Sequence, residues 1–321
     1  MAHMTNSLAT VDQLYRRTAS FSSLPSDLQD AIFFATQSLT QAAGLLLRLP
    51  QSVTAQASVV LARYWLEDSL LANEFSDVSA ASLFLVAKLS AHPCRPRDVC
   101  NVYAYLLSAA SPLLRPKPSP PEPDPSSYYL SEGAYAAFQA RILQLEARIL
   151  YTLGFDTHVA LPHGLAVTYL QALDFCGDSS RTKITRRVVA YLNTALLSPQ
   201  MLYLTHQPNV LAVAAIYSAA RDAEISAKMP ECPWWEVFDV DREELGFLVV
   251  AMRSLEGLVQ KLQNDFKGFN NSGMITRNDI DAEMTRRGLK ITNGENPGIG
   301  DMDEEEAMMR SLDDRAERMG E

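Results

Sequence analysis

The sequence predicts an all-α protein made of two tandem five-helix domains and a flexible acidic C-terminal tail. Apolar residues recur every three or four positions through most of the chain, as they do on the buried face of an amphipathic helix. Residues 78–88 (VSAASLFLVAK) also match residues 211–221 (LAVAAIYSAAR), and both stretches end in alanine followed by a cation. A helix that is apolar on almost every side belongs at the centre of a bundle, so each stretch predicts the central helix of its own bundle.

Length and composition indicate a globular protein of more than one domain. The chain has 321 residues, of which 47% are hydrophobic and 21% are charged, enough to bury two cores of ordinary size. The four cysteines are scattered without a C-x-x-C pair, which favours reduced thiols in an intracellular protein: Cys94, Cys100, Cys176 and Cys232. Charged or amide side chains interrupt every apolar stretch before the length of a membrane span, so we expect a soluble protein.

Helical spacing and helix-breaking residues place the elements of the first domain, residues 25–160. Residues 1–24 read as an extension that opens on a cloning scar. The first predicted helix starts at residues 25–27, where Ser26 or Asp27 could cap it, and stops at Pro50. The next four are predicted from after Pro50 to about residue 66 and over about residues 76–91, 97–110 and 134–153. Between Pro112 and Pro125 seven prolines exclude a helix, so residues 112–127 predict an extended loop, either an insertion without a role or a docking peptide for a proline-reading domain.

The pattern starts again in the second domain, residues 161–268. Helical segments are expected at residues 164–175, 183–197, 208–223 and 242–266, with a short aromatic piece around Trp234, Trp235 and Phe238 before the last. We interpret the Trp pair as packing rather than as a ligand cage, because such side chains supply large buried area. Residues 269–321 predict the flexible tail, with short amphipathic helices possible at residues 279–287 and 304–318.

The charge pattern argues against direct nucleic-acid binding. The formal net charge is -10, and residues 270–321 alone carry 13 acidic against 7 basic side chains. A nucleic-acid binder needs a basic face to neutralise phosphates, and no Lys/Arg-rich stretch supplies one.

No catalytic or metal-binding constellation is present in the sequence. The chain lacks the phosphate-binding glycine loops, the H-E-x-x-H zinc motif and the G-x-S-x-G nucleophile motif. Its five histidines lie singly, without the helical spacing of metal ligands. We therefore predict no catalytic residue, no metal and no cofactor.

A set of ordered motifs over residues 24–266 resembles the cyclins, and within them the L-type cyclins. The motifs are QAAGLLLRLP (41–50), AKL (87–89), RPRDV with NVY (95–103), LEARIL with LGF (145–155), PH (162–163), YLQ (169–171) and the helix at 212–221. The resemblance implies two five-helix cyclin boxes in a non-enzymatic subunit that binds and activates a cyclin-dependent Ser/Thr kinase. It also implies a role in transcription or pre-mRNA splicing and a nuclear location.

The resemblance also implies a kinase-binding surface on the first box. A Lys at the end of the third helix and a Glu in the fifth reach the kinase in this family, and Lys88 and Glu146 stand at those motif positions. Leu89, Leu150 and Phe155 match apolar positions that would pack on the same kinase helix. A Lys–Glu pair among apolar residues offers polar contacts that fix the register of a hydrophobic patch.

The chain departs from the family at several points. Ser90 and Ala91 stand where the family has acidic residues after the Lys, the proline-rich loop lengthens one connection, and no Arg-Ser repeat of the kind many L-type cyclins carry follows. The first helix lacks the Met and Trp with which cell-cycle cyclins dock substrates.

The sequence leaves two alternative functions open. A general transcription factor with cyclin boxes would need a basic face and usually a zinc ribbon. A helical adaptor without a kinase would need repeats beyond the second, whereas the periodicity stops near Phe266. Splicing or transcription factors are further expected partners, and a membrane partner is not expected.

Overall fold

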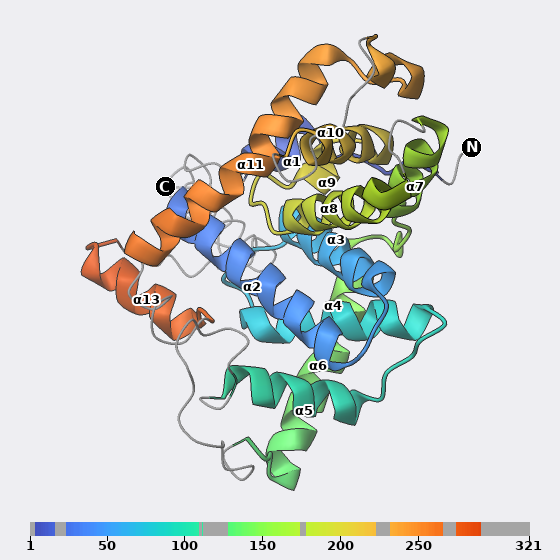
Figure 1. Ribbon diagram of the computed structural model, residues 1–321. Coiled ribbons are helices and arrows are strands. Elements are labelled where there is room, and N and C mark those ends of the chain that lie inside the picture. The colour runs from blue at the N-terminus through green and yellow to red at the C-terminus, as the bar shows by residue number, and fades with distance from the viewer. Residues whose placement is uncertain are drawn as a thin grey trace, which may run out of the picture. The chain divides into compact units, whose positions relative to one another are not determined.

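The computed structural model describes residues 4–16, 24–108, 111, 128–173, 178–222, 232–265 and 274–289 (Figure 1). Every regular element within these residues is a helix, so the predicted all-α class is confirmed. The proline-rich segment 112–127, Phe266 and the acidic end of the chain beyond residue 289 lie outside the described residues. Within the described part, no helix has both the length and the apolar character that crossing a membrane requires.

The first bundle contains five helices in the predicted order, packed around the third. They are α2 (Ser26–Leu46), α3 (Gln51–Glu67), α4 (Phe75–Leu89), α5 (Pro96–Leu107) and α6 (Glu132–Thr152). Helix α4 packs on α2, α3, α5 and α6, and its residues 75–87 are all buried. Pro50 precedes α3 and Pro96 opens α5, where a missing N–H costs nothing, while Ser131 caps α6 by accepting a hydrogen bond from the Ala134 N–H at 3.2 Å.

The core of the first bundle holds a buried polar chain as well as apolar side chains. The Ser79 hydroxyl on α4 lies 2.7 Å from Thr40 Oγ1 on α2 and 2.6 Å from Tyr103 Oη on α5. All three residues are fully buried, so their hydroxyls need partners within the protein, and Thr40 Oγ1 also donates to the Thr36 carbonyl at 2.9 Å. These hydrogen bonds connect α4 to α2 and to α5 at defined positions along α4.

The second bundle repeats the arrangement around α10. Its elements are α7 (Pro162–Leu173), α8 (Asp178–Leu196), α9 (Leu202–Thr205), α10 (Pro208–Ala220), the 3₁₀ helix η3 (Trp234–Phe238) and α11 (Arg242–Asp265). Helix α10 packs on α7, α8, α11 and η3. The two matching stretches found in the sequence are therefore the central helices of the two bundles. The one-turn helix α9 was not predicted, because four residues are too few to show a helical period.

Residues near the N-terminus join the two bundles, although the sequence indicated only an extension there. Asn6 is buried and exchanges hydrogen bonds with the Ala160 backbone at 2.9 and 2.7 Å and with the Gln207 side chain at 3.0 Å. The short helix α1 (Val11–Arg16) packs on α3. A single asparagine has no periodic signature, so only the tertiary structure shows this role.

A last helix, α13 (Arg277–Arg286), follows the second bundle at the position where a short amphipathic helix was expected. Thr276 and Asp279 cap its start, with the Thr276 N–H and hydroxyl donating to Asp279 Oδ2 at 2.9 and 2.7 Å. Ile275 and Ile280 are fully buried.

Candidate protein-binding surface

Lys88 and Glu146 meet at the surface of the first bundle. Lys88 lies in the last turn of α4 and Glu146 in the second half of α6, and Lys88 Nζ donates to Glu146 Oε1 at 2.9 Å. The Lys88 side chain is 59% exposed, whereas that of Glu146 is only 8% exposed. The pair thus presents a cation to solvent above a carboxylate that is largely covered.

The two side chains are held by their own helices. The Lys88 ammonium lies 5.9 Å from the centroid of the Phe84 ring, one turn earlier on α4, and its charge suits the C-terminal end of a helix. Glu146 is adjacent on α6 to Leu145, and Ile142 and Ile149 are fully buried one turn to either side. Its backbone is therefore fixed by the core of the bundle.

Exposed apolar side chains continue from this pair along α6. Leu143, Ala147, Leu150 and Tyr151 recur at the three- and four-residue spacing of one helix face, and all are exposed except Leu150, which is half-buried. Leu89 follows Lys88 directly and is exposed. We define the α4–α6 face as these residues with the ion pair and the aromatic residue that follows α6: Lys88, Leu89, Leu143, Glu146, Ala147, Leu150, Tyr151 and Phe155.

The turn after α6 holds an aromatic ring outside the core. Gly154 and Phe155 both adopt positive φ, 55° and 63°, and the Phe155 N–H donates to the Leu150 carbonyl at 2.8 Å. Glycine adopts this conformation freely, but for phenylalanine it costs about 1 kcal/mol or more. The Phe155 ring is 61% exposed and packs edge-on against Tyr151 at 5.5 Å, so burial does not offset that cost. Backbone strain of this kind clusters at binding and active sites, so Phe155 is a candidate binding residue.

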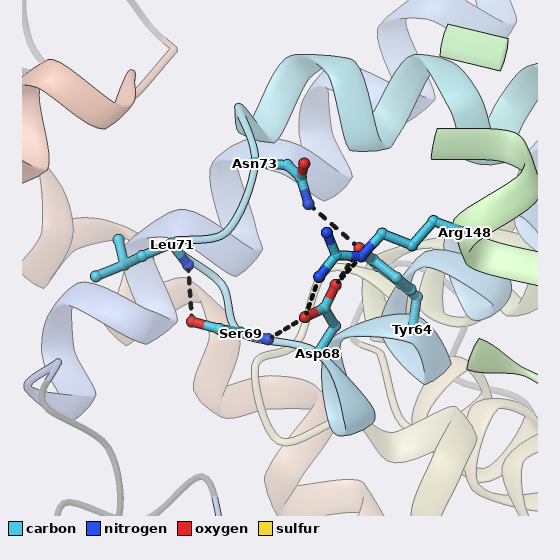
Figure 2. Close-up of polar contacts among 6 residues, drawn as sticks. All are labelled: Tyr64, Asp68, Ser69, Leu71, Asn73 and Arg148. Atoms are coloured by element: carbon cyan, nitrogen blue, oxygen red, sulfur yellow. Dashed lines mark hydrogen bonds and ion pairs between the residues drawn. The ribbon is translucent and has the colours of Figure 1, made fainter. Parts of the chain in front are cut away.

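Ion pairs on another side of α6 fix its position. Figure 2 shows the pair of Arg148 with Asp68 and the hydrogen bonds around it. Asp68, which follows α3, accepts from Arg148 Nε at 2.8 Å and Nη2 at 3.0 Å, from the Ser69 N–H at 2.9 Å and from the Tyr64 hydroxyl. Asn73 Nδ2 donates to the same Tyr64 hydroxyl at 3.3 Å. Burial, reinforced by Asp68, raises the pKa of Tyr64 well above its ordinary value, so Tyr64 remains a donor at neutral pH.

A second ion pair repeats this anchoring two turns earlier on α6. Arg141 Nε lies 2.7 Å from Asp77 Oδ2, and the Asp77 side chain is 9% exposed. The two ion pairs connect α6 to α4 and to the end of α3, and they favour the orientation in which its apolar stripe faces outward beside Lys88.

The structure brings the five residues named from the sequence to one part of the first bundle, and it adds three. Leu143, Ala147 and Tyr151 were missed, although their spacing with the other α6 residues on the face was visible in the sequence. Their spacing did not identify them as surface residues, because the sequence does not show which apolar side chains of a helix are buried. Phe138, Ile142 and Ile149 already accounted for the packing of this helix on the core.

Within the described residues the structure shows no group of three His, Cys, Asp or Glu side chains that could hold a metal ion. Trp234 is buried and packs in the second bundle, as expected for a core side chain, while Trp235 is only half-buried.

Sequence comparison relates the chain to the L-type cyclins. It is 32% identical over 243 residues to Cyclin-L2 of Homo sapiens, a match that covers 75% of this chain and 43% of that protein. It is 33% identical over 232 residues to Cyclin-L1 of Gallus gallus, covering 72% of this chain and 40% of that protein. The chain belongs to the cyclin family. The chain spans less than half the length of these two relatives. No family model matches it.

Solved structures share the fold of this cyclin. A chain of the CAK complex from Chaetomium thermophilum bound to ATP-γ-S superposes with a TM-score of 0.52 at 14% identity, covering 90% of this cyclin and 87% of that chain. A chain of the yeast RNA Pol II CTD kinase complex CTDK-1 superposes with a TM-score of 0.57 at 15% identity, covering 91% and 93%. At such identities the likeness concerns the fold alone.

Proposed function

We propose that this cyclin is a non-enzymatic regulatory subunit that binds and activates a cyclin-dependent Ser/Thr kinase through the α4–α6 face. The observation that carries the proposal is the Lys88–Glu146 pair, 2.9 Å apart, beside exposed apolar side chains on two anchored helices. The fold-level neighbours support it, since one belongs to a complex that is described as an RNA Pol II CTD kinase.

The chemistry of the face suits a partner helix with an apolar stripe. Leu143, Tyr151 and Phe155 would be covered on binding, and each large apolar side chain contributes roughly 1.5–3 kcal/mol when fully buried. Lys88 and Glu146 would exchange part of their mutual contact for polar groups of the kinase. Such charges contribute less to affinity than to the register in which two surfaces meet.

Activation in this proposal is a population shift. A cyclin that binds the active arrangement of the kinase better than the inactive one raises the fraction of active kinase. In the active arrangement the catalytic strand Lys pairs with the Glu of the regulatory helix. All catalytic groups therefore belong to the kinase.

The domain division and cellular setting are part of the same proposal. Residues 25–160 form the first cyclin box and residues 161–268 the second, with the kinase on the first. The L-type relatives favour a nuclear role in transcription or splicing, with factors of those processes as further partners.

The test is a pull-down of a cyclin-dependent kinase, followed by a kinase assay, with Lys88→Glu, Glu146→Lys and the double variant carrying both. Each single change places a like charge against its presumed counterpart, and we expect binding to fall about 30-fold or more. The double variant restores the ion pair within the cyclin but reverses both charges that the kinase meets, so binding should stay low. Lys183→Glu, an exposed change on α8, is the control for charge alone.

Recovery of kinase binding in the double variant would contradict the interface and leave the pair a purely internal contact. Wild-type binding in both single variants would remove the α4–α6 face from the kinase interface. Folded protein that captures no kinase in any form would favour the adaptor alternative.

A further inference from the structure

A cleft in the second bundle carries chemistry that the proposed kinase interface does not use. It has a volume of about 690 Å³ and lies among the end of α10, η3 and the first half of α11. The residues that give it its character are Tyr217, Arg221, Trp235, Arg242, Leu245 and Arg253. A volume of this size is within the usual range of binding sites.

The cleft is basic in an acidic chain. Three of its lining residues are arginines and one, Glu236, is acidic, whereas the whole chain has 38 acidic and 28 basic side chains. An accumulation of guanidinium groups against the overall charge of the chain favours an anionic ligand.

The arginines keep donors for such a ligand. Within the described residues Arg242 is in no ion pair or side-chain hydrogen bond. Arg253 Nη2 lies 3.7 Å from Asp222 Oδ1, at the outer limit of an ion pair, and that carboxylate also accepts from Arg187 and, at 2.8 Å, from the Tyr191 hydroxyl. Arg221 uses Nη1 to donate to the Tyr217 hydroxyl at 2.7 Å, which orients its guanidinium beside the aromatic ring.

Apolar and aromatic groups make up the remainder of the cleft. The rings of Tyr217 and Trp235 meet edge-on at 6.4 Å, and Leu245, which also lines the cleft, is buried. These groups provide contact area for side chains that flank an anionic group. Free phosphate and the triphosphate tail of a nucleotide have no such flanking side chains. Arginine beside Tyr and Trp is also the composition in which binding energy concentrates at protein interfaces.

We propose that this cleft binds a phosphorylated side chain on a segment of a partner protein. A phosphoryl group carries a charge of about -1.5 to -2 at pH 7 and three acceptor oxygens, which match several guanidinium groups better than one carboxylate does. Arginine forks bind phosphate oxygens in pairs, so two of these side chains hold one phosphoryl group in a defined orientation.

The experiment measures fluorescence anisotropy of a short labelled peptide with one central phosphoserine flanked by leucine, titrated with the whole chain. Parallel titrations use the unphosphorylated peptide, the same peptide with aspartate at the central position, and inorganic phosphate as competitor. We expect the phosphopeptide to bind at least about tenfold more tightly than the other two peptides, and binding to weaken as salt rises.

Charge reversal locates the site. Arg242→Glu and Arg253→Glu should each weaken phosphopeptide binding about tenfold or more, whereas Arg186→Glu, an exposed change on α8 of the same bundle, should leave it unchanged. Arg242→Lys keeps the charge and should retain part of the affinity, which separates a lost contact from misfolding. Glu146→Lys should bind the phosphopeptide normally, so failure of the kinase proposal and failure of this one are distinguishable.

Three outcomes would overturn the proposal. They are equal affinity for the three peptides, binding that Arg242→Glu and Arg253→Glu leave intact, and competition by inorganic phosphate at the same concentration as by the unlabelled phosphopeptide. The last would mean that the cleft recognises a free anion and not a protein segment.

Discussion

The central helices of the two bundles end alike and then meet different surroundings. Phe84 and Lys88 on α4 correspond to Tyr217 and Arg221 at the end of α10, and in both the cation lies over the ring one turn earlier, at 5.9 and 5.5 Å from its centroid. Lys88 continues to the Glu146 carboxylate on α6. Arg221 instead shares a cleft with two further arginines, both from α11.

This comparison shows how one helical unit can carry two kinds of surface. The spacing of an aromatic residue and a cation four residues later fixes the local geometry in both copies. The charge on the fifth helix of each bundle then decides the chemistry. A carboxylate on α6 gives a closed ion pair beside apolar side chains, and arginine on α11 leaves a basic cleft.

The interiors of α4 and α10 differ as well, and substitutions there should give the largest difference in stability between the two helices. Ser79→Ala removes the hydrogen bond of Ser79 to the buried Tyr103 hydroxyl and one of the two hydrogen bonds of the Thr40 hydroxyl, so it should lower the free energy of unfolding by about 1–3 kcal/mol. Ser218 on α10 is equally buried, but its hydroxyl has no hydrogen-bond partner among the residues that the structure describes. Ser218→Ala should therefore change stability by no more than about 0.5 kcal/mol. Urea unfolding of the two variants measures the difference, and equal losses would contradict it.

Acid should destabilise the protein through histidines of the second bundle. Burial lowers the pKa of His163, against a weaker opposing effect of its hydrogen bond to Asn193, and burial also lowers the pKa of His206. Both folded-state values therefore lie below the unfolded value of about 6.5, and in that window the unfolded chain binds more protons. Stability from these groups is present above pH of about 6.5 and is lost as the pH falls below it, by at most about 1.4 kcal/mol per pH unit for each group.

The measurement is thermal unfolding of the wild type and of the double variant His163→Gln, His206→Gln between neutral and mildly acidic pH. The double variant should show a shallower loss of stability with acid, even if it is less stable at neutral pH. An unchanged slope would assign the acid sensitivity to other groups.

The smallest effect concerns the hydroxyl that Tyr217 has and Phe84 lacks. Tyr217→Phe removes the acceptor of the Arg221 hydrogen bond and makes the end of α10 resemble that of α4. Because Arg221 is exposed, we expect a loss of stability below about 1 kcal/mol and weaker phosphopeptide binding by about threefold, since the guanidinium is less well oriented. Unfolding and anisotropy titrations check the two results, and a tighter phosphopeptide complex would show that the hydrogen bond competes with the ligand.

Much of the fold could be predicted because long helices repeat their pattern many times. The helix predicted to start near Ser26 and Asp27 and to stop before Pro50 coincides with α2, and the short aromatic piece at Trp234 coincides with η3. The repeat at residues 78–88 and 211–221 identified the two central helices. Boundaries were less accurate where no breaker stands, as at the end of α4, which stops at Leu89 and not near residue 91.

What the sequence determined by itself was the class, the order of the helices, and five candidate residues for one surface. Only the tertiary structure decided that Lys88 touches Glu146, that Asn6 links the two bundles, and that Arg221, which follows α10, shares one cleft with two arginines of α11. The physical reason is range. Helical period and turn chemistry act between residues a few positions apart, whereas these contacts join residues 58, 154 and up to 32 positions apart, and only the packing of complete helices brings them together.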